Sequence, residues 1–249
     1  MDEWKRLLGI ALPALDEVFV DPFEASTPDW TVGGGAAIGF EFGHRSTDDI
    51  DIFLQRGRLK QFLPSNNAAA KAISDKTQWP GHHLKFELDK GEIDFLTAPL
   101  HTEPGFSIKH ILGRDVAFET PEEVIVKKMR YRAVLFTARD VFDLAVVHSR
   151  RPNLVHVLAH EVPDKLTAVR ERVRLHASRG VSALEQQIAP TAFGRTILPT
   201  VFELADAAIN GALAISGKDV VDRPRSIGKG PADLDDRGPP PVKDQGRGR

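Results

Sequence analysis

Two aspartates separated by one residue are the side chains of this sequence best suited to chemistry. Asp49 and Asp51 lie in an alternating apolar run that predicts a strand over residues 48–55. Side chains two positions apart on a strand share a face, so both carboxylates are expected on one face and Ile50 and Ile52 on the buried one. Neighbouring carboxylates repel each other, and a divalent cation is the usual compensation. The spacing therefore predicts a Mg²⁺ site.

A glycine-rich turn and a basic–hydroxyl step precede these carboxylates. Glycines at 33–35 allow backbone N–H groups to approach a phosphate closely, and Arg45 and Thr47 follow shortly after them. Mg²⁺ typically takes one or two carboxylates together with phosphate oxygens of a substrate. A triphosphate cradle beside metal carboxylates is the equipment of nucleotidyl transfer from a nucleoside triphosphate (NTP). We expect Gly33, Gly34, Arg45 and Thr47 to bind that nucleotide.

A third carboxylate follows in a predicted hairpin over residues 82–96. Its two alternating segments are separated by Asp-Lys-Gly, a favourable turn. Asp94 faces away from Ile93 and Phe95 in the second strand. A sheet that brings Asp94 beside Asp49 and Asp51 would complete a two-metal site, or would make Asp94 the base for an acceptor hydroxyl. The alternative is a strand with a solvated polar face.

A basic segment begins at a predicted helix start. Thr120 suits the N-cap, Pro121 the first helical position, and Glu123 the position that closes a capping box. The segment carries Lys127, Lys128, Arg130, Arg132 and Arg139. Such a patch could hold triphosphate charge or an RNA backbone, or could simply be a solvated helix face. We favour Lys128 as the triphosphate contact, because a lysine near the leaving group neutralises developing charge.

These blocks resemble the minimal nucleotidyltransferases, and more narrowly the AbiEii/AbiGii toxins of bacterial abortive-infection and toxin–antitoxin systems. The resemblance covers roughly residues 28–148. It rests on Gly33-Gly34, Gly43-His44-Arg45, Thr47-x-Asp49-Ile-Asp51-Ile-Phe53, Glu122–Arg132 and Arg139-Asp140-Val-Phe-Asp143-Leu144. Gly35 departs from the Thr or Ser that the family often has. Counting back from Arg139 places the family lysine at Lys128, with Lys127 as the alternative.

The resemblance implies an α+β fold, with a polymerase-beta-like mixed sheet, flanking helices and a helical C-terminal domain. It further implies a Mg²⁺-dependent toxin that transfers NMP from an NTP to RNA, possibly tRNA, in a toxin–antitoxin or phage-defence system, opposed by a cognate antitoxin. It makes Asp143 a functional residue that orients Lys128 or the ribose. Two alternatives remain open. One is an enzyme that modifies an antibiotic or another small molecule, and the other is a non-catalytic nucleotide- or partner-binding module.

Composition excludes several other classes. The 249 residues carry a net charge of −2 and no cysteine, so a thiolate metal site or nucleophile is impossible. His156 and His160 have a zinc-compatible spacing, but Cys and an intervening Glu in the metalloprotease order are absent. A charged start and the lack of an apolar run near ~20 residues predict a cytoplasmic protein without a membrane partner.

The chain is expected to have three parts. Residues 1–119 form the nucleotidyltransferase core, residues 120–215 a helical domain, and residues 216–249 a disordered tail. That tail is rich in Pro, Gly and charge and has no aromatic residue. Helices are expected over 3–19, 34–42, 66–78 and within 121–149. Strands are expected over 30–32, 48–55 and 82–96, and a strand or ordered connection over 111–118.

Overall fold

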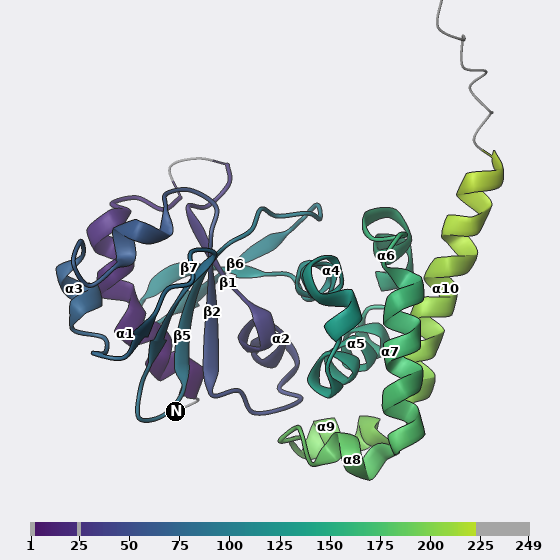
Figure 1. The fold of residues 1–249 in the computed structure, drawn as a ribbon. Coiled ribbons are helices and arrows are strands. Elements are labelled where there is room, and N and C mark those ends of the chain that lie inside the picture. The colour runs from purple at the N-terminus through teal and green to yellow at the C-terminus, as the bar shows by residue number, and fades with distance from the viewer. Residues whose placement is uncertain (1–2, 24–25, 223–249) are drawn as a thin grey trace, which may run out of the picture.

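A computed structural model describes residues 3–23 and 26–222, and the side chains of 218–222 are not considered (Figure 1). The strands are β1 Trp30–Gly33, β2 Asp49–Leu54, β3 Thr77–Gln78, β4 His83–Glu87, β5 Glu92–Thr97, β6 Phe106–Ile111 and β7 Arg114–Glu119. The helices are α1 Glu3–Val18, α2 Gly34–Phe42, α3 Ala68–Lys71, α4 Pro121–Arg132, α5 Ala138–Arg150, α6 Leu154–Glu161, α7 Leu166–Arg179, α8 Val181–Glu185, α9 Ala192–Ile197 and α10 Val201–Asp222. Short 3₁₀ turns are η1 Leu59–Phe62, η2 Ala133–Leu135 and η3 Leu198–Thr200.

The strands form one seven-stranded sheet in the order β3-β4-β5-β2-β1-β7-β6. β2 pairs in parallel with β5, and β1 pairs in parallel with β7, whereas the remaining neighbours are antiparallel. The mixed sheet with flanking helices confirms the α+β expectation. The two central parallel pairs bring β2, β5, β1 and β7 side by side although they are distant in sequence.

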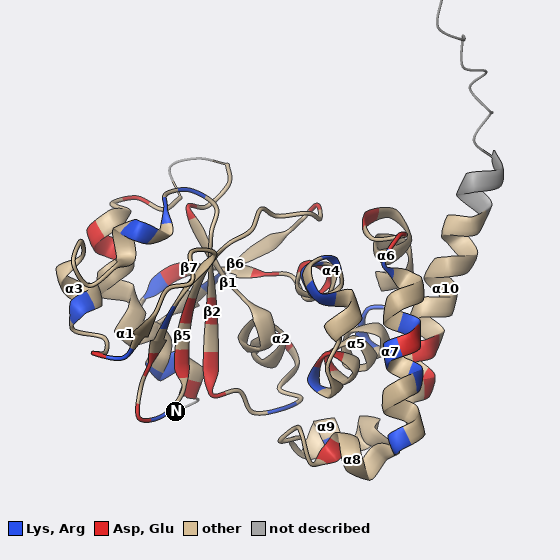
Figure 2. Cartoon of the chain, in the orientation of Figure 1, with Lys and Arg blue, Asp and Glu red and all other residues tan. Residues whose placement is uncertain are grey.

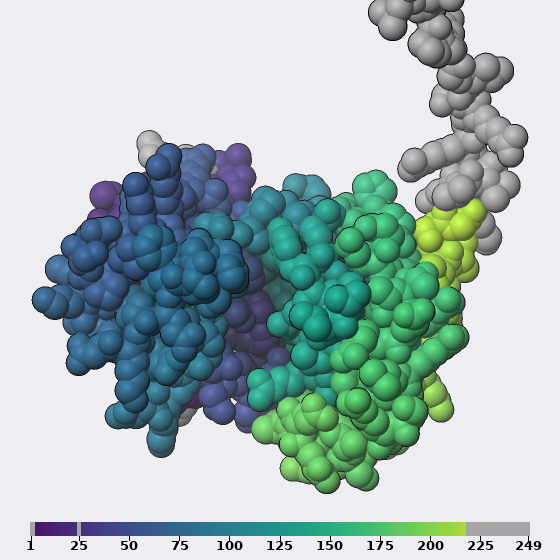
Figure 3. All heavy atoms as spheres, in the orientation of Figure 1, coloured from purple at the N-terminus to yellow at the C-terminus, as the bar shows by residue number. Residues whose placement is uncertain are grey.

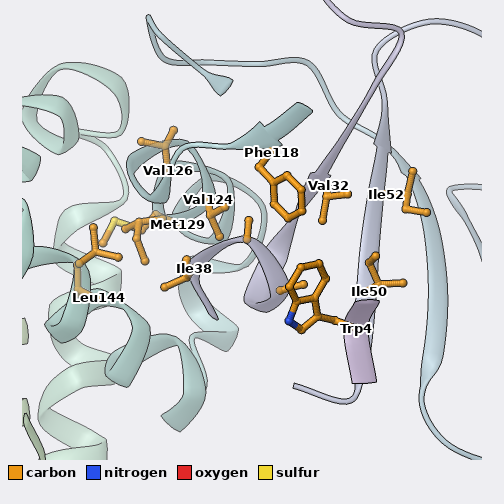
Figure 4. Packing of buried hydrophobic residues seen from close by; sticks show 14 of the residues in the cluster. Trp4, Val32, Ile38, Ile50, Ile52, Phe118, Val124, Val126, Met129 and Leu144 are labelled. Atoms are coloured by element: carbon orange, nitrogen blue, oxygen red, sulfur yellow. The ribbon is translucent and has the colours of Figure 1, made fainter. Parts of the chain in front are cut away.

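One face of the sheet is apolar and is covered by α1. Ile50 and Ile52 are completely buried there, and the Trp4 ring meets the Phe118 ring edge-on at 5.8 Å (Figure 4). Burial of such side chains contributes about 1.5–3 kcal/mol each. Because the isoleucines of β2 point into this core, its aspartates must point to the opposite face.

The C-terminal helices pack as a bundle beside the sheet, with α4 lying between the two parts (Figure 1). α10 packs against α5, α6 and α7 through its buried small and branched residues, Val201, Ala205, Ala208, Ile209 and Ala212. One buried hydrophobic cluster extends from Trp4 to Ala212. The sheet and the bundle therefore share a continuous core, which fixes the position of α4 over the sheet.

One helical stretch differs from the expectation about membrane spans. Among the described residues, the 26-residue stretch Ala192–Gly217 is long and apolar enough to cross a membrane by length and composition alone. Glu203 and Asp206 interrupt its apolar run, which is why the sequence did not reveal it. In this structure 33% of its most apolar window is buried inside the protein.

Several local expectations need correction. The helix expected over 66–78 is limited to α3, because residues 77–78 pair with β4 at the sheet edge. β6 was missed, and it forms a hairpin with β7 around a turn in which Leu112 and Gly113 both have positive φ. Helix α10 continues to Asp222, so the first residues of the expected tail are helical. Residues 223–249 lie outside the described residues.

The start of α4 confirms half of the predicted cap. Thr120 Oγ1 accepts a hydrogen bond from the Glu123 backbone N–H at 3.2 Å. The Glu123 carboxylate does not close the box. It accepts hydrogen bonds from the backbone N–H groups of His101 and Thr102 instead, and so ties the preceding loop to α4.

Candidate active site

The predicted metal carboxylates lie together on adjacent strands. In the parallel register of β2 and β5, Asp51 pairs with Asp94 and Asp49 pairs with Glu92. Acidic side chains accordingly mark both strands in Figure 2. The sheet thus brings Asp94 beside Asp51, as the sequence predicted, and adds Glu92 as a fourth carboxylate.

The same register continues across the sheet as a row of functional side chains. Lys85 pairs with Asp94 on one side, and Gly33 pairs with Asp51 on the other. Continuing the parallel register of β1 and β7 by one residue adds Glu119. Residues in register on neighbouring strands face the same way. The row across β4, β5, β2, β1 and β7 therefore reads Lys85, Asp94, Asp51, Gly33 and Glu119.

The carboxylates of β2 and β5 are half-buried and poorly neutralised. Within the described part of the chain, no ion pair involves Asp49 or Asp51. Burial raises the pKa of both groups, and for Asp49 the charge of Glu92 adds to that effect. Burial, followed by the charge of Asp51, raises the pKa of Asp94 to about 7. Asp94 Oδ1 is buried and has no hydrogen-bond partner.

Lys85 is the cation that forms ion pairs with this acidic group among the described residues. Its ammonium contacts Glu92 and lies 3.7 Å from Asp94 Oδ2. The sequence analysis missed Lys85, although its alternation with Leu84 and Phe86 already placed it on the polar face of the hairpin. Other cations act on these carboxylates without pairing with them: the charge of Lys128 opposes the rise in the pKa of Asp51, and that of Arg139 opposes the rise for Asp49.

The glycines before α2 make room for side chains of the site itself. Gly34 has a φ of +58°, and a Cβ there would lie 1.7 Å from Asp51 Oδ2. A Cβ at Gly35 would lie 2.4 Å from Arg45 Nη2, and one at Gly33 would lie 2.4 Å from Glu119 Oε2. The three glycines are therefore required for close packing around the row. The triphosphate contact expected for Gly33 and Gly34 remains a prediction.

A second acidic group lies beneath the start of α2, and it is fully paired. Asp143 accepts hydrogen bonds from Arg45 Nε and Nη2 at 2.7 and 3.0 Å and from Lys128 Nζ at 2.8 Å, with His44 Nε2 also 2.7 Å from Oδ1. Asp140 accepts from Lys128 Nζ at 2.7 Å and from Arg132 Nη2 at 2.6 Å. Both carboxylates are completely buried.

These pairs decide the charge of the second group. Burial alone would raise the pKa of Asp143, but the charges of Arg45 and Lys128 outweigh it and hold that pKa well below its usual range. Burial would also raise the pKa of Asp140, but the charges of Lys128 and Arg132 outweigh burial and lower that pKa. Asp143 thus contacts both Lys128 and Arg45, and the functional role that the family resemblance implies for it remains a prediction.

The two candidate lysines of α4 have different surroundings. Lys127 Nζ pairs with Glu119 Oε1 at 2.6 Å and lies 4.1 Å from the centroid of the Phe53 ring. Lys128 Nζ is held between Asp140 and Asp143. Thr47 lines the same cavity as Lys128, and its Oγ1 donates to the Asp49 backbone carbonyl at 3.2 Å. The choice of Lys128 as the triphosphate contact remains a prediction.

Two adjoining cavities cover the row, and they form one cleft between the sheet and α4, where Figure 3 shows a hollow. The charged half, about 570 Å³, is lined by residues that include Arg45, Thr47, Asp49, Lys85, Asp94 and Arg139. The apolar half, about 480 Å³, is lined by residues that include Phe53, Leu96, Glu119, Val124 and Tyr131. Gly35, Asp51, Lys128 and Arg132 line both halves.

Solved structures are similar to this chain at low sequence identity. A "putative nucleotidyltransferase" from Helicobacter pylori superimposes with a TM-score of 0.50 at 12% identity, covering 88% of this chain and 98% of that one. JHP933 from Helicobacter pylori gives 0.49 at 12% identity, with 89% and 97% covered. An antigenic nucleotidyltransferase-like protein from Paracoccidioides brasiliensis gives 0.37 at 15% identity, with 67% and 92% covered.

Sequence comparison gives the family. No curated protein matches the chain. Residues 18–209 match the family described as nucleotidyl transferase AbiEii toxin, Type IV TA system. That match spans the sheet, the row of carboxylates, α4 and most of the helical bundle. The chain is therefore a transferase of the nucleotidyltransferase type and belongs to the AbiEii toxin family.

Proposed function

We propose that this protein transfers NMP from an NTP to a hydroxyl of an RNA acceptor, possibly tRNA, in a Mg²⁺-dependent reaction. The observation that carries the proposal is the pairing of Asp51 with Asp94 in a cleft that Arg45 and Lys128 also line. Acidic side chains for cations and basic side chains for phosphates meet there, as nucleotidyl transfer requires.

The residues present fit a divalent cation. Asp49 and Asp51 share a face, and Asp94 has a buried oxygen without a partner, so negative charge and free oxygen ligands are both at hand. The described residues contain no ready-made cluster of three or more His, Cys, Asp or Glu ligands. Mg²⁺ needs few protein ligands, since it usually retains waters and binds substrate phosphates. Bound Mg²⁺ would act as a Lewis acid at the reacting phosphate.

The side chains of the row and of the paired group would divide the remaining work. Asp94 would accept the proton of the acceptor hydroxyl, because its pKa of about 7 suits a base at neutral pH. The hydroxyl oxygen would form a new bond to the α-phosphorus as the bond to the bridging oxygen breaks and pyrophosphate leaves. Lys128 and Arg45, held by Asp143, would bind the triphosphate at the start of α2.

An RNA acceptor is supported by basic side chains at the edge of the cleft. Arg132 is 46% exposed at its side chain, and the exposed Arg139 lines the charged half. Such charges suit a phosphate backbone and oppose a cationic antibiotic acceptor. Membership of a toxin family of type IV toxin–antitoxin systems supports a cognate antitoxin, and also a role in phage defence. A cytoplasmic location is part of the same proposal.

The direct test is nucleotide transfer to total cellular RNA. The wild type and the Asp49→Ala/Asp51→Ala variant are incubated with Mg²⁺ and each labelled NTP in turn. Label in an RNA band with the wild type alone would establish the reaction and narrow the acceptor. Pyrophosphate release with small-molecule acceptors only would show that the acceptor is a small molecule and not RNA. Absence of both transfer and NTP binding would favour a non-catalytic binding module.

A further inference from the structure

The apolar half of the cleft contains a buried charge that the proposed transfer step does not use. Glu119 ends β7, two strands from Asp51 in the row and therefore about 10 Å away. Its Oε1 accepts from Lys127 Nζ at 2.6 Å and from Thr31 Oγ1 at 2.9 Å. Its Oε2 is buried and has no hydrogen-bond partner. An orphaned acceptor of this kind needs an explanation, because burying it unpaired is costly.

The direction of the proposed reaction limits what this half can hold. In-line transfer places the acceptor oxygen, the α-phosphorus and the pyrophosphate on one line. That line crosses the strands from Asp94, over Asp51, to Gly34 at the start of α2. The nucleoside must then leave the line along the strands, towards either end of β2.

The two ends of β2 offer opposite environments. Towards its start the cleft is lined by charged groups, among them Glu92 and Arg139. Towards its end it is lined by Phe53 and Leu96, with Val124 and Tyr131 from α4. A flat heterocycle is favoured where apolar and aromatic side chains surround it and a few polar groups fix its orientation.

We propose that the apolar half is the nucleoside subsite, in which the base lies among Phe53, Leu96 and Tyr131 and one of its N–H groups donates to Glu119 Oε2. This inference rests on the proposed function. The base is a better donor for Glu119 than the ribose, because the ribose adjoins the α-phosphate over Asp51, whereas the base edge lies beyond the sugar. Phe53 and the Lys127–Glu119 ion pair form the inner wall, and Tyr131 stands at the mouth with 58% of its surface exposed.

The first test separates the nucleoside from the triphosphate. Equilibrium binding is measured with α,β-methylene analogues of the four NTPs and with inorganic tripolyphosphate, each in the presence of Mg²⁺. Tyr131→Ala should raise the Kd of the nucleotide analogues roughly 5- to 100-fold, the loss expected for base stacking, and leave the Kd of tripolyphosphate unchanged. Val134→Ala is the matched control. Val134 is 69% exposed on η2 and lines neither half, so both Kd values should stay at the wild-type level.

The outcomes distinguish the two proposals. Equal losses for nucleotide and tripolyphosphate in Tyr131→Ala, or no loss for either, would overturn the nucleoside subsite. An unchanged nucleotide Kd together with a raised KM for RNA in Tyr131→Ala would assign the apolar half to the acceptor, and would also overturn the nucleoside subsite. Failure of the wild type to bind either probe would overturn the proposed function itself.

The second test addresses Glu119. The Kd of the best-bound NTP analogue is compared with that of a counterpart whose base lacks the donating N–H. The Kd of the counterpart divided by the Kd of the analogue measures the preference for the N–H group. This ratio should be about tenfold smaller in Glu119→Gln than in the wild type, because a neutral acceptor replaces a charged one. Thr31→Val is the matched control, since it removes the other hydrogen bond to the carboxylate without neutralising it. An unchanged ratio in a folded Glu119→Gln protein excludes Glu119 as the acceptor. Glu119→Asp, which retracts the charge, gives the same comparison if Glu119→Gln does not fold.

Discussion

Two acidic groups line the same cleft, and the protein treats them in opposite ways. Asp140 and Asp143 are completely buried. Each of the two carboxylates forms ion pairs with basic side chains, which are Arg45, Lys128 and Arg132. The carboxylates of β2 and β5 are less buried, yet within the described part of the chain only Lys85 pairs with any of them. Greater burial thus coincides with better pairing, as the cost of desolvating a charge requires.

The difference assigns different tasks to the two groups. The paired group has lowered pKa values and holds its basic partners in fixed positions, which makes it a frame for the side chains that we propose to bind phosphate. The row carboxylates have raised pKa values and unused oxygens, so they gain the most from an added cation. Substitutions in the two groups should therefore separate activity from stability.

The largest effect is expected for Asp51→Asn. It removes a charge that we propose to bind the cation, and loss of several kcal/mol of transition-state stabilisation corresponds to a decrease in transfer rate of about 1000-fold or more. The free energy of unfolding should stay unchanged or increase, because repulsion with Asp49 and Asp94 is relieved. Radiolabel transfer and urea unfolding on the same preparation measure both quantities. Nearly full activity in Asp51→Asn would contradict the assignment of this row as catalytic.

Asp143→Asn should show the converse pattern. It leaves Arg45 and Lys128 buried without their shared partner, and breaking such a buried pair costs about 3–5 kcal/mol of unfolding free energy. Urea unfolding of Asp143→Asn beside Asp49→Asn, an equal change of charge among the carboxylates of β2 and β5, makes the comparison direct. Equal stability of the two variants would contradict the division into frame and reactive group.

The sequence predicted the reactive group better than the frame. Alternation alone placed Asp49, Asp51 and Asp94 on polar faces, because period-two patterns survive in any sheet. Their adjacency required the parallel pairing of β2 and β5, which has no local signal. The resemblance to a known family supplied Asp143, but spacing along the chain gave no sign that it binds Arg45, a residue 98 positions earlier.

The residues that sequence reasoning missed became visible through strand register and local pairing. Lys85 and Glu119 lie on short strands with ordinary alternation, and only their places in the row show what they face. The helix expected over 66–78 failed for a similar reason, since pairing of residues 77–78 with β4 overrode their local propensity. Tertiary pairing decided each of these positions.

Lys85→Met tests whether the carboxylates of β2 and β5 bind a divalent cation more tightly when their paired lysine is removed. Removing the ammonium that pairs with Glu92 and Asp94 should tighten the Kd for Mn²⁺ without nucleotide about tenfold, because a repelling charge close to the cation is lost. Electron paramagnetic resonance of free Mn²⁺ measures this Kd, and Lys85→Arg, which keeps the charge, should bind Mn²⁺ as the wild type does. Unchanged or weaker binding in Lys85→Met would show that Lys85 does not oppose cation binding.

The smallest effect is expected in the pH dependence of stability, and it also separates the two groups. Asp94 has a pKa of about 7 in the folded protein and about 3.9 when unfolded. The folded state therefore binds more protons at Asp94 between about pH 4 and 7, and the contribution of Asp94 to the free energy of unfolding should fall as pH rises through that window. Glu119, whose pKa burial raises to about 7, adds a decrease of the same sign.

Asp143 titrates outside that window. Its folded pKa lies well below the usual value, so the stability it confers is complete above about pH 4 and is lost only on further acidification. Urea unfolding of the wild type and of Asp94→Asn at pH 5 and pH 8 without divalent cations isolates Asp94. The contributions of His83, His101 and His148, whose pKa burial lowers and which act in the opposite direction, are common to both proteins. Asp94→Asn should remove on the order of 1 kcal/mol of the decrease between these pH values, a figure reduced for solvent screening. An Asp94→Asn variant whose stability depends on pH as that of the wild type does would mean that Asp94 is already neutralised by groups of the protein itself, and the contrast between the two acidic groups would then lose its physical basis.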